Sequence, residues 1–136
     1  MINIVIACGG GFSSSFIASR IEKDFAGRNL DKEFSVTFLP LAILKERHEN
    51  VDVAMLCPHL RYQAESWLEK ERVSFPVYMI PSRLYALIDA DIIIEDAVDI
   101  IEIFRNNPAN PACFPGEEDC IHNKRETSYR RFREKN

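Results

Sequence analysis

The chain begins with the stretch INIVIACGGGFSSS, residues 2–15, and this stretch decides the fold. Residues 2–7 are rich in β-branched side chains, and only Asn3 interrupts their apolar character, as expected for a strand buried in a parallel sheet. A glycine-rich turn follows directly, and apolar residues then recur at helical spacing from about Ser14 until Gly27 ends the pattern. The sequence therefore predicts a strand, a tight turn and a helix.

The same alternation repeats along the chain. Further strands are predicted at 34–39, 51–56 and 76–80, and helices at 41–48, 60–71 and 92–104, with a single helical turn near 82–87. Four strands that alternate with helices predict an α/β fold, namely a four-stranded parallel doubly wound sheet with right-handed crossovers and helices on both faces.

Composition is that of an ordinary globular protein. The chain has 136 residues, 46% of them hydrophobic and 28% charged, and this length suits a single core. The net charge of −4 argues against nucleic acid as a partner, because binding a phosphate backbone requires a basic surface. The charge is uneven: residues 1–104 hold 10 Lys and Arg against 16 Asp and Glu, whereas residues 105–136 hold 7 against 5.

The texture of the sequence changes after Phe104. Residues 105–120 contain three of the seven prolines and show no periodicity. We therefore predict a domain at 1–104, followed at 105–136 by a Pro/Asn-rich linker and a charged tail. The basic run from Lys124 to Lys135 also contains Glu126 and Glu134, so a solvated end is its simplest interpretation, either as a short helix or as a disordered chain.

The lack of recognisable targeting signals in the sequence indicates where the protein and its cysteines reside. No apolar run approaches the roughly 18 residues of a membrane span, and the N-terminus lacks the basic segment and cleavage site of a signal peptide. We expect a cytoplasmic protein whose four cysteines are thiols. Cys57 closes an apolar strand and is expected to be a small buried residue. Cys113, Cys120 and His122 fit no zinc spacing and lack a fourth ligand, so no metal is predicted.

The turn after the first strand is the candidate site. Open α/β sheets bind ligands at the carboxyl ends of their strands. The three glycines of this turn let successive backbone N–H groups point inward, and the following helix adds unsatisfied amides and the positive end of its dipole. Such a turn is typical of an anion cradle. The same field would lower the pKa of the Cys8 thiol, so we predict that Cys8 is a nucleophile that attacks phosphorus.

Other phosphate-binding motifs fail at particular residues. A dinucleotide fingerprint needs a third glycine where Ser14 stands, and a Walker loop needs a lysine that does not occur before Lys23. A cysteine phosphatase loop needs an arginine six positions after its nucleophile, to bind the phosphoryl oxygens bidentately. That position is again Ser14.

The pattern C-x-x-G-x-S-[ST]-S, from Cys8 to Ser15, resembles the phosphorylation loop of the enzyme IIB component in the lactose/cellobiose family of the bacterial phosphoenolpyruvate-dependent sugar phosphotransferase system. VDVAMLCPHLRYQ (51–63) and FPVYMIPSRLYALIDAD (75–91) are similar to the segments around the third and fourth strands of that family. The resemblance covers roughly residues 1–104. It implies a four-stranded parallel sheet with helices on both faces, similar to the low-molecular-weight phosphatase and flavodoxin-like architecture.

The resemblance also implies a function. In that family the IIB cysteine attacks a phosphohistidine of a IIA partner, and the phosphocysteine passes its phosphoryl group to a sugar bound by the membrane-embedded IIC partner. Cys8 would be the catalytic cysteine of such a phosphotransferase, without a cofactor, for a sugar of the cellobiose, lactose or chitobiose type. The residues expected to bind the phosphoryl group are Gly9, Gly10, Gly11, Phe12, Ser13, Ser14 and Ser15.

Four further residues are expected near the site, and two other functions stay open. The neighbours are Pro58, His59, Tyr62 and Tyr85; the family usually has glycine and glutamine where Cys57 and His59 stand. The first alternative is a hydrolase on the low-molecular-weight phosphatase scaffold, against which Ser14 argues. The second is a regulatory protein that senses phosphorylation at Cys8.

Overall fold

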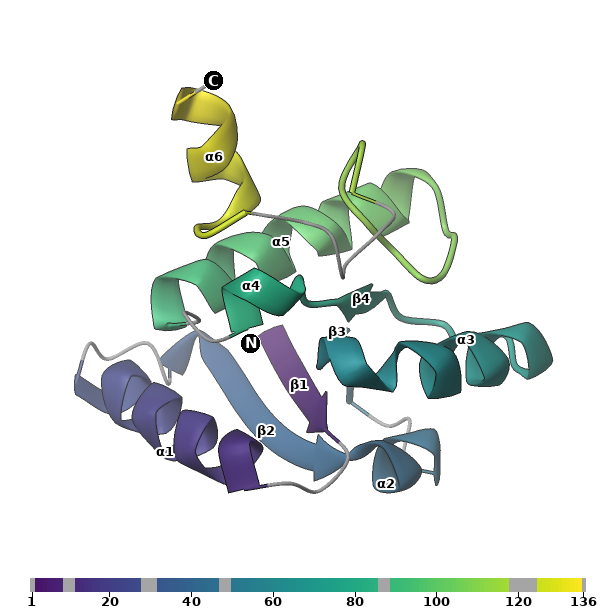
Figure 1. Cartoon of the computed structure of the whole chain (residues 1–136), viewed down its shortest axis with the longest axis horizontal. Coiled ribbons are helices and arrows are strands. Elements are labelled where there is room, and N and C mark those ends of the chain that lie inside the picture. The colour runs from purple at the N-terminus through teal and green to yellow at the C-terminus, as the bar shows by residue number, and fades with distance from the viewer. Residues whose placement is uncertain are drawn as a thin grey trace.

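The computed structural model describes residues 2–8, 12–27, 32–46, 50–85, 89–117 and 125–135, and for residues 8, 12–18 and 135 it describes the backbone alone. Its four strands are β1 (Ile2–Cys8), β2 (Phe34–Pro40), β3 (Val53–Leu56) and β4 (Val77–Met79). All neighbouring strands pair in parallel, in the order β2-β1-β3-β4. The predicted four-stranded parallel sheet is confirmed, with β1 hydrogen-bonded on both sides (Figure 1).

The helices agree with the predicted alternation (Figure 1). They are α1 (Phe12–Gly27), α2 (Leu41–Glu46), the short 3₁₀ helix η2 (Pro58–Leu60), α3 (Arg61–Lys70), α4 (Ser82–Tyr85), α5 (Ala90–Asn106) and α6 (Tyr129–Lys135). Helix α5 begins two residues earlier than predicted because the Asp89 carboxylate caps it, accepting a hydrogen bond from the backbone N–H of Ile92 at 3.0 Å.

Side-chain alternation along the buried strands divides the apolar core between the two faces of the sheet. Ile4 and Ile6 of β1 pack with residues of α1, α4 and α5, whereas Val5 and Ala7 pack with residues of α2 and α3. The sheet is therefore doubly wound, with α1 and α5 on one face and α2 and α3 on the other (Figure 1).

The segment after α5 corrects the prediction of a linker. Ala112 forms a parallel bridge with Tyr78 and donates its backbone N–H to Val77 at 2.8 Å. Asn110 accepts a hydrogen bond from the Val77 N–H at 2.8 Å, so backbone groups on the outer edge of β4 are satisfied. Ala112 and Phe114 are buried in the core between the sheet and α5. The linker was predicted because the segment shows no periodicity. That prediction failed because an irregular segment can also pack into a core. The boundary at residue 104 remains a prediction.

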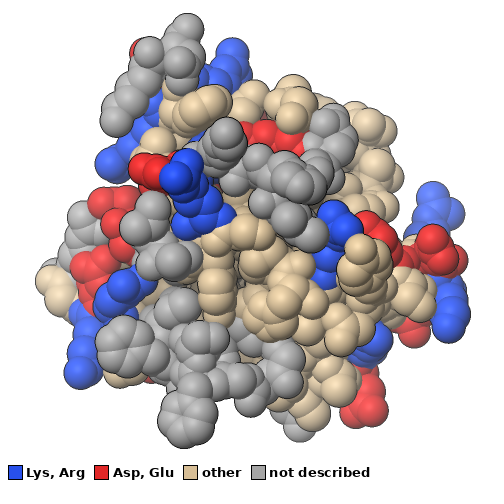
Figure 2. Space-filling model, viewed as in Figure 1, with Lys and Arg blue, Asp and Glu red and all other residues tan. Residues whose placement is uncertain are grey.

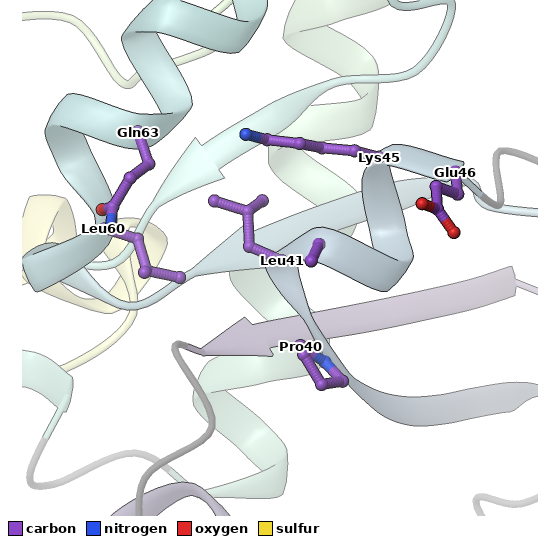
Figure 3. Close-up of a pocket in the computed structure, with 7 residues that line it drawn as sticks. Pro40, Leu41, Lys45, Glu46, Leu60 and Gln63 are labelled. Atoms are coloured by element: carbon purple, nitrogen blue, oxygen red, sulfur yellow. The ribbon is translucent and has the colours of Figure 1, made fainter.

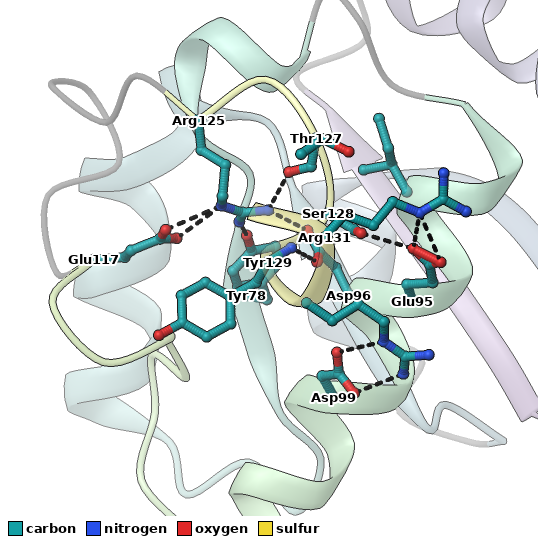
Figure 4. Close-up of polar contacts among 12 residues, drawn as sticks. Tyr78, Glu95, Asp96, Asp99, Glu117, Arg125, Thr127, Ser128, Tyr129 and Arg131 are labelled. Atoms are coloured by element: carbon teal, nitrogen blue, oxygen red, sulfur yellow. Dashed lines mark hydrogen bonds and ion pairs between the residues drawn. The ribbon is translucent and has the colours of Figure 1, made fainter. Parts of the chain in front are cut away.

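The prediction that the basic run is a solvated end is wrong at Arg125, because this residue is buried. Figure 4 shows the polar contacts around it. Its guanidinium donates to Asp96 Oδ2 at 3.0 Å, to the Tyr78 hydroxyl at 2.6 Å and to Glu117 Oε2 at 3.0 Å. We call these four residues the Arg125 cluster. The second oxygen of Asp96 accepts the backbone N–H of Tyr129 at 2.9 Å, which joins the start of α6 to α5. Every charge in the cluster thus has an opposite charge and a hydrogen bond.

Charge complementarity extends from the Arg125 cluster along α6. Arg130 pairs with Asp99 at 2.7 Å and Arg131 with Glu95 at 2.8 Å, both acids lying on α5 (Figure 4). The Phe114 ring stacks on Tyr129 with centroids 4.2 Å apart. The basic residues of the tail therefore pair with acidic residues of the preceding domain, mainly on α5.

The pKa values of the Arg125 cluster follow from its burial. Burial raises the pKa of Asp96 to about 6, although Arg125 opposes the rise. Burial alone would lower the pKa of Arg125, but Tyr78, Asp96 and Glu117 outweigh it and raise the pKa. Burial, followed by the charge of Asp96, likewise raises the pKa of Tyr78. Arg125 therefore stays protonated and Tyr78 neutral at every pH at which the protein is handled.

Replacing Arg125 with alanine should destabilise the protein by about 3–5 kcal/mol, because Asp96 would be left buried without its counter-charge. Urea unfolding followed by circular dichroism measures this change. The matched control is Arg72→Ala, at an exposed position, which should change the free energy of unfolding by less than about 0.5 kcal/mol. Equal effects of the two substitutions would show that the tail contributes nothing to the core.

The pKa of Asp96 predicts an unusual pH dependence. A carboxyl whose pKa is about 6 in the folded state and about 3.9 in the unfolded state stabilises the fold at low pH, and this contribution is lost as the pH rises through 6. Between pH 8 and pH 5 the wild-type protein should therefore gain stability, on the order of 1 kcal/mol, relative to Asp96→Asn. Urea unfolding of both proteins across this range measures the difference; a relative loss would mean that Arg125 holds the pKa below its unfolded value.

Candidate functional site

The carboxyl ends of the strands form the edge on which the predicted site lies. Cys8 is in register with Pro40 of β2, and Ala7 with Leu56 of β3. The pairing continues past β3, because the Cys57 N–H donates to the Ala7 carbonyl at 3.1 Å. The connections after β1, β2 and β3 therefore leave the sheet side by side, with Cys8 at the end of the strand between the other two.

Helix α1 begins at Phe12, four residues after Cys8. It is 16 residues long and has no acidic residue in its first turn, so its N-terminal amides and dipole face the end of β1 without a counter-charge from that turn. Ser13, Ser14 and Ser15 lie within this first turn. Gly9, Gly10 and Gly11, and the side chains of Cys8 and of residues 12–15, lie outside the described residues. Their predicted contacts with a phosphoryl group stay predictions.

The connection after β3 carries the predicted neighbours Pro58 and His59. Both belong to η2, where Pro58 is half-buried and the His59 side chain is exposed. Because this connection starts beside the end of β1, it shares the edge with Cys8. His59 is therefore placed to contact a molecule that approaches this edge.

The two predicted tyrosines differ in their surroundings. Tyr62, in the first turn of α3, is 72% exposed; the Arg61 guanidinium lies 4.8 Å from its ring centroid and donates to its hydroxyl at 2.9 Å. Tyr85, at the end of α4, is half-buried and packs against the core that α1 and α5 cover. An exposed aromatic ring beside a cation is typical of contact surfaces, whereas the position of Tyr85 is explained by packing.

A pocket of about 440 Å³ opens between α2 and the η2–α3 connection. Figure 3 shows the Lys45 side chain extending across it toward Gln63. Pro40, the register partner of Cys8, lies at its base, so the pocket adjoins the same edge of the sheet. Its lining residues are Pro40, Leu41, Ala42, Lys45, Glu46, Leu60 and Gln63.

Lys45 and Gln63 were missed by the sequence-based prediction. Lys45 belongs to no motif, Gln63 only ends the quoted segment 51–63, and it is the packing of α2 beside α3 that brings them together. The predicted parallel pairing of the strands could have indicated that Lys45 and Gln63 are neighbours, because it places the start of α2 next to the connection after β3.

Cys57 corrects the expectation that every cysteine is a thiol. It is fully buried, as expected for the end of an apolar strand, but it is disulfide-bonded. Cys113 is half-buried and is not in a disulfide, and Cys120 lies outside the described residues. The prediction of a thiol at position 57 relied only on the expected cytoplasmic compartment.

Surface charge, potential metal ligands and helix hydrophobicity are further features of the described residues. On the face shown in Figure 2, basic and acidic side chains gather mainly at the left and right sides, and many of the described side chains between them are uncharged. Among the described residues, no three His, Cys, Asp or Glu side chains gather as they would around a metal ion. None of the helices described in the structure combines the length and apolar character that crossing a membrane requires.

Comparison with known proteins identifies one family. Residues 3–96, more than half of the chain, match the family described as the lactose/cellobiose-specific IIB subunit of the PTS system. Among solved structures, the chain is similar to the lactose-specific IIB component domain of the phosphoenolpyruvate:carbohydrate phosphotransferase system from Streptococcus pneumoniae. The two share 18% sequence identity with a TM-score of 0.48, over 62% of this chain and 81% of that one. No curated protein matches the sequence.

The contrast between the two tyrosines gives a prediction. Tyr62→Ala should change the free energy of unfolding by less than about 0.5 kcal/mol, because its ring is mostly exposed. Tyr85→Ala should cost about 1–3 kcal/mol, because the ring packs against the core. Tyr85→Phe is the control that keeps the ring. Urea unfolding measures all three variants. A larger loss of stability for Tyr62→Ala than for Tyr85→Ala would show that Tyr62, and not Tyr85, packs against the core.

Proposed function

The chain belongs to the family of lactose/cellobiose-specific IIB subunits of the sugar phosphotransferase system, and from this premise we propose that Cys8 is its phosphoryl acceptor. Membership of this family gives the protein a role in sugar phosphoryl transfer, since IIB domains act as phosphotransferases in sugar uptake. The single observation that carries the proposal is the position of Cys8, at the carboxyl end of β1 and four residues before α1.

The position supports the chemistry in two ways. The N-terminus of α1 favours the thiolate over the thiol, and a thiolate is the nucleophilic form of cysteine. Unsatisfied amides at the same helix end can bind the oxygens of a phosphoryl group after it has been transferred. Hydroxyl groups of Ser13, Ser14 and Ser15 add further donors to this cradle.

Transfer then takes place in two displacements. The Cys8 thiolate attacks phosphorus of a phosphohistidine on the IIA partner; an S–P bond forms, the N–P bond breaks, and the imidazole takes up a proton. A sugar hydroxyl held by the IIC partner next attacks the phosphocysteine; an O–P bond forms, the S–P bond breaks, the hydroxyl proton passes to solvent, and the thiolate is regenerated. Both steps need positioning and charge stabilisation rather than a cofactor.

The phosphocysteine must survive between the two partners. Arginine at position 14 would place a bidentate donor on the phosphoryl oxygens, as in cysteine phosphatases, and Ser14 stands there instead. This serine favours a carrier over the alternative of a low-molecular-weight phosphatase-like hydrolase. The proposed carrier acts in the cytoplasm, on a sugar of the cellobiose, lactose or chitobiose type, with Pro58, His59 and Tyr62 on the surface that meets its partners.

Incubation with phosphoenolpyruvate, the general phosphotransferase proteins and a lactose/cellobiose-type IIA protein tests the proposal. Intact-mass measurement should show the addition of one phosphoryl group, and peptide mapping should place it on Cys8. Cys8→Ala should take up none, whereas the matched variant Cys113→Ala should be phosphorylated as the wild type is.

Two outcomes would contradict the proposal. Phosphorylation that persists in Cys8→Ala would remove Cys8 as the acceptor. Multiple turnover of an aryl phosphate by the wild-type protein, absent from Cys8→Ala, would make the protein a hydrolase instead of a carrier.

A further inference from the structure

The disulfide at Cys57 is a feature that phosphoryl transfer does not explain. Cys57 is buried directly after β3, and it is disulfide-bonded. The chain has four cysteines, and Cys113 is not disulfide-bonded. Cys8 and Cys120 are therefore the candidates for the partner of Cys57.

Strand register favours Cys8. Ala7 of β1 and Leu56 of β3 are paired, and the Cys57 N–H donates to the Ala7 carbonyl at 3.1 Å, so positions 8 and 57 follow one paired position on adjacent strands. Neighbouring strands lie about 4.8 Å apart, and a disulfide needs Cα atoms about 4.4–6.8 Å apart.

Alternation of side chains supports the same pairing. Ala7 and Leu56 both belong to the core on the α2 and α3 face, whereas Ile6 and Met55 both belong to the core on the α1 and α5 face. Because the period of a strand is two, the next positions along both chains fall on the same face of the sheet.

We propose that Cys8 and Cys57 form a reversible disulfide, and that this modification switches off the phosphoryl acceptor. The bond itself stands on the register of β1 and β3. Its effect on transfer rests on the proposed function of Cys8. A Cys8 sulfur bonded to Cys57 is not a thiolate and therefore cannot attack phosphorus.

A peroxide is the class of oxidant that completes the reaction. The Cys8 thiolate attacks one peroxide oxygen, the O–O bond breaks, and the products are a sulfenic acid at Cys8 and, after protonation, water. The Cys57 sulfur then attacks the sulfenic sulfur, the S–O bond breaks, and a second water leaves with the thiol proton. Two thiols and one hydrogen peroxide thus give one disulfide and two waters.

The burial of Cys57 gives the two cysteines different parts in this reaction. A buried thiol is a poor target for a dissolved oxidant, whereas a thiolate beside a helix N-terminus is a good one. Cys8 is therefore oxidised first, and Cys57 resolves the sulfenic acid before further oxygen is added. A thiol reductant reverses the disulfide, so the carrier is protected as well as silenced.

Hydrogen peroxide treatment of the full chain, followed by tryptic mapping without reductant, tests the pairing. Cleavage after Arg20, Arg47 and Arg61 separates the peptide of residues 1–20, which holds Cys8, from that of residues 48–61, which holds Cys57. The expected product is one peptide that joins the two. A bond from residues 48–61 to the peptide 106–124, which holds Cys113 and Cys120, would overturn the pairing, as would the absence of any cross-link.

The role of Cys57 has its own readout. After peroxide and then dithiothreitol, the wild type and Cys113→Ala should recover full phosphoryl acceptance from IIA. Cys57→Ala should accept phosphate normally before treatment, gain two or three oxygens on peptide 1–20 after it, and fail to recover. Full recovery of Cys57→Ala would overturn the protective role.

The two proposals fail in different ways. If the reduced wild type accepts no phosphoryl group but peroxide joins residues 1–20 to 48–61, the proposed function fails and the disulfide stands. If the reduced protein is phosphorylated on Cys8 and peroxide does not join these peptides, the disulfide fails and the function stands.

Discussion

Backbone hydrogen bonds hold β1 between β2 and β3 in parallel register, and they bring the ends of all three strands to one edge of the sheet. This register places Cys8 beside Pro40 and next to the connection that carries Cys57, Pro58 and His59. A slip of one residue would turn the core-facing side chains of β1 to the opposite face, so the two apolar cores hold the register. The same burial that stabilises the sheet therefore fixes which backbone segments lie beside the proposed acceptor.

The segment beyond α5 is part of this fold. Phe114 belongs to the core, and the buried Arg125 joins the tail to Asp96 of α5 and Tyr78 of β4. A buried guanidinium is tolerated because Asp96 and Glu117 compensate its charge. Phe114, Glu117 and Arg125 lie outside the part of the chain that matches the IIB family, since the match ends at residue 96, whereas Tyr78 and Asp96 lie inside it.

The sequence predicted the fold well where the pattern was periodic. Buried strands such as residues 2–7 and an amphipathic helix such as α5 carry their geometry in the spacing of apolar side chains. Phe114 and Arg125 could not be predicted, because an irregular segment has no period and a buried arginine looks like a surface residue until its partners are known. The disulfide of Cys57 was missed for a related reason: a disulfide depends on tertiary contacts, and no local motif around Cys57 marks one. At the candidate site, the glycine-rich turn and its serines were recognisable as a local motif, whereas the pocket beside Lys45 arises only from tertiary packing.

The central claim is that Cys8 carries a phosphoryl group that reaches a sugar and is not lost to water. The most direct measurement follows the label from the isolated ³²P-phosphocysteine form after it is mixed with membrane vesicles that contain a lactose/cellobiose-type IIC protein and a disaccharide. We expect the label to stay on Cys8 until vesicles and sugar are both present, and then to appear as sugar phosphate. Release of the label as inorganic phosphate at the same rate with and without the sugar would contradict this claim.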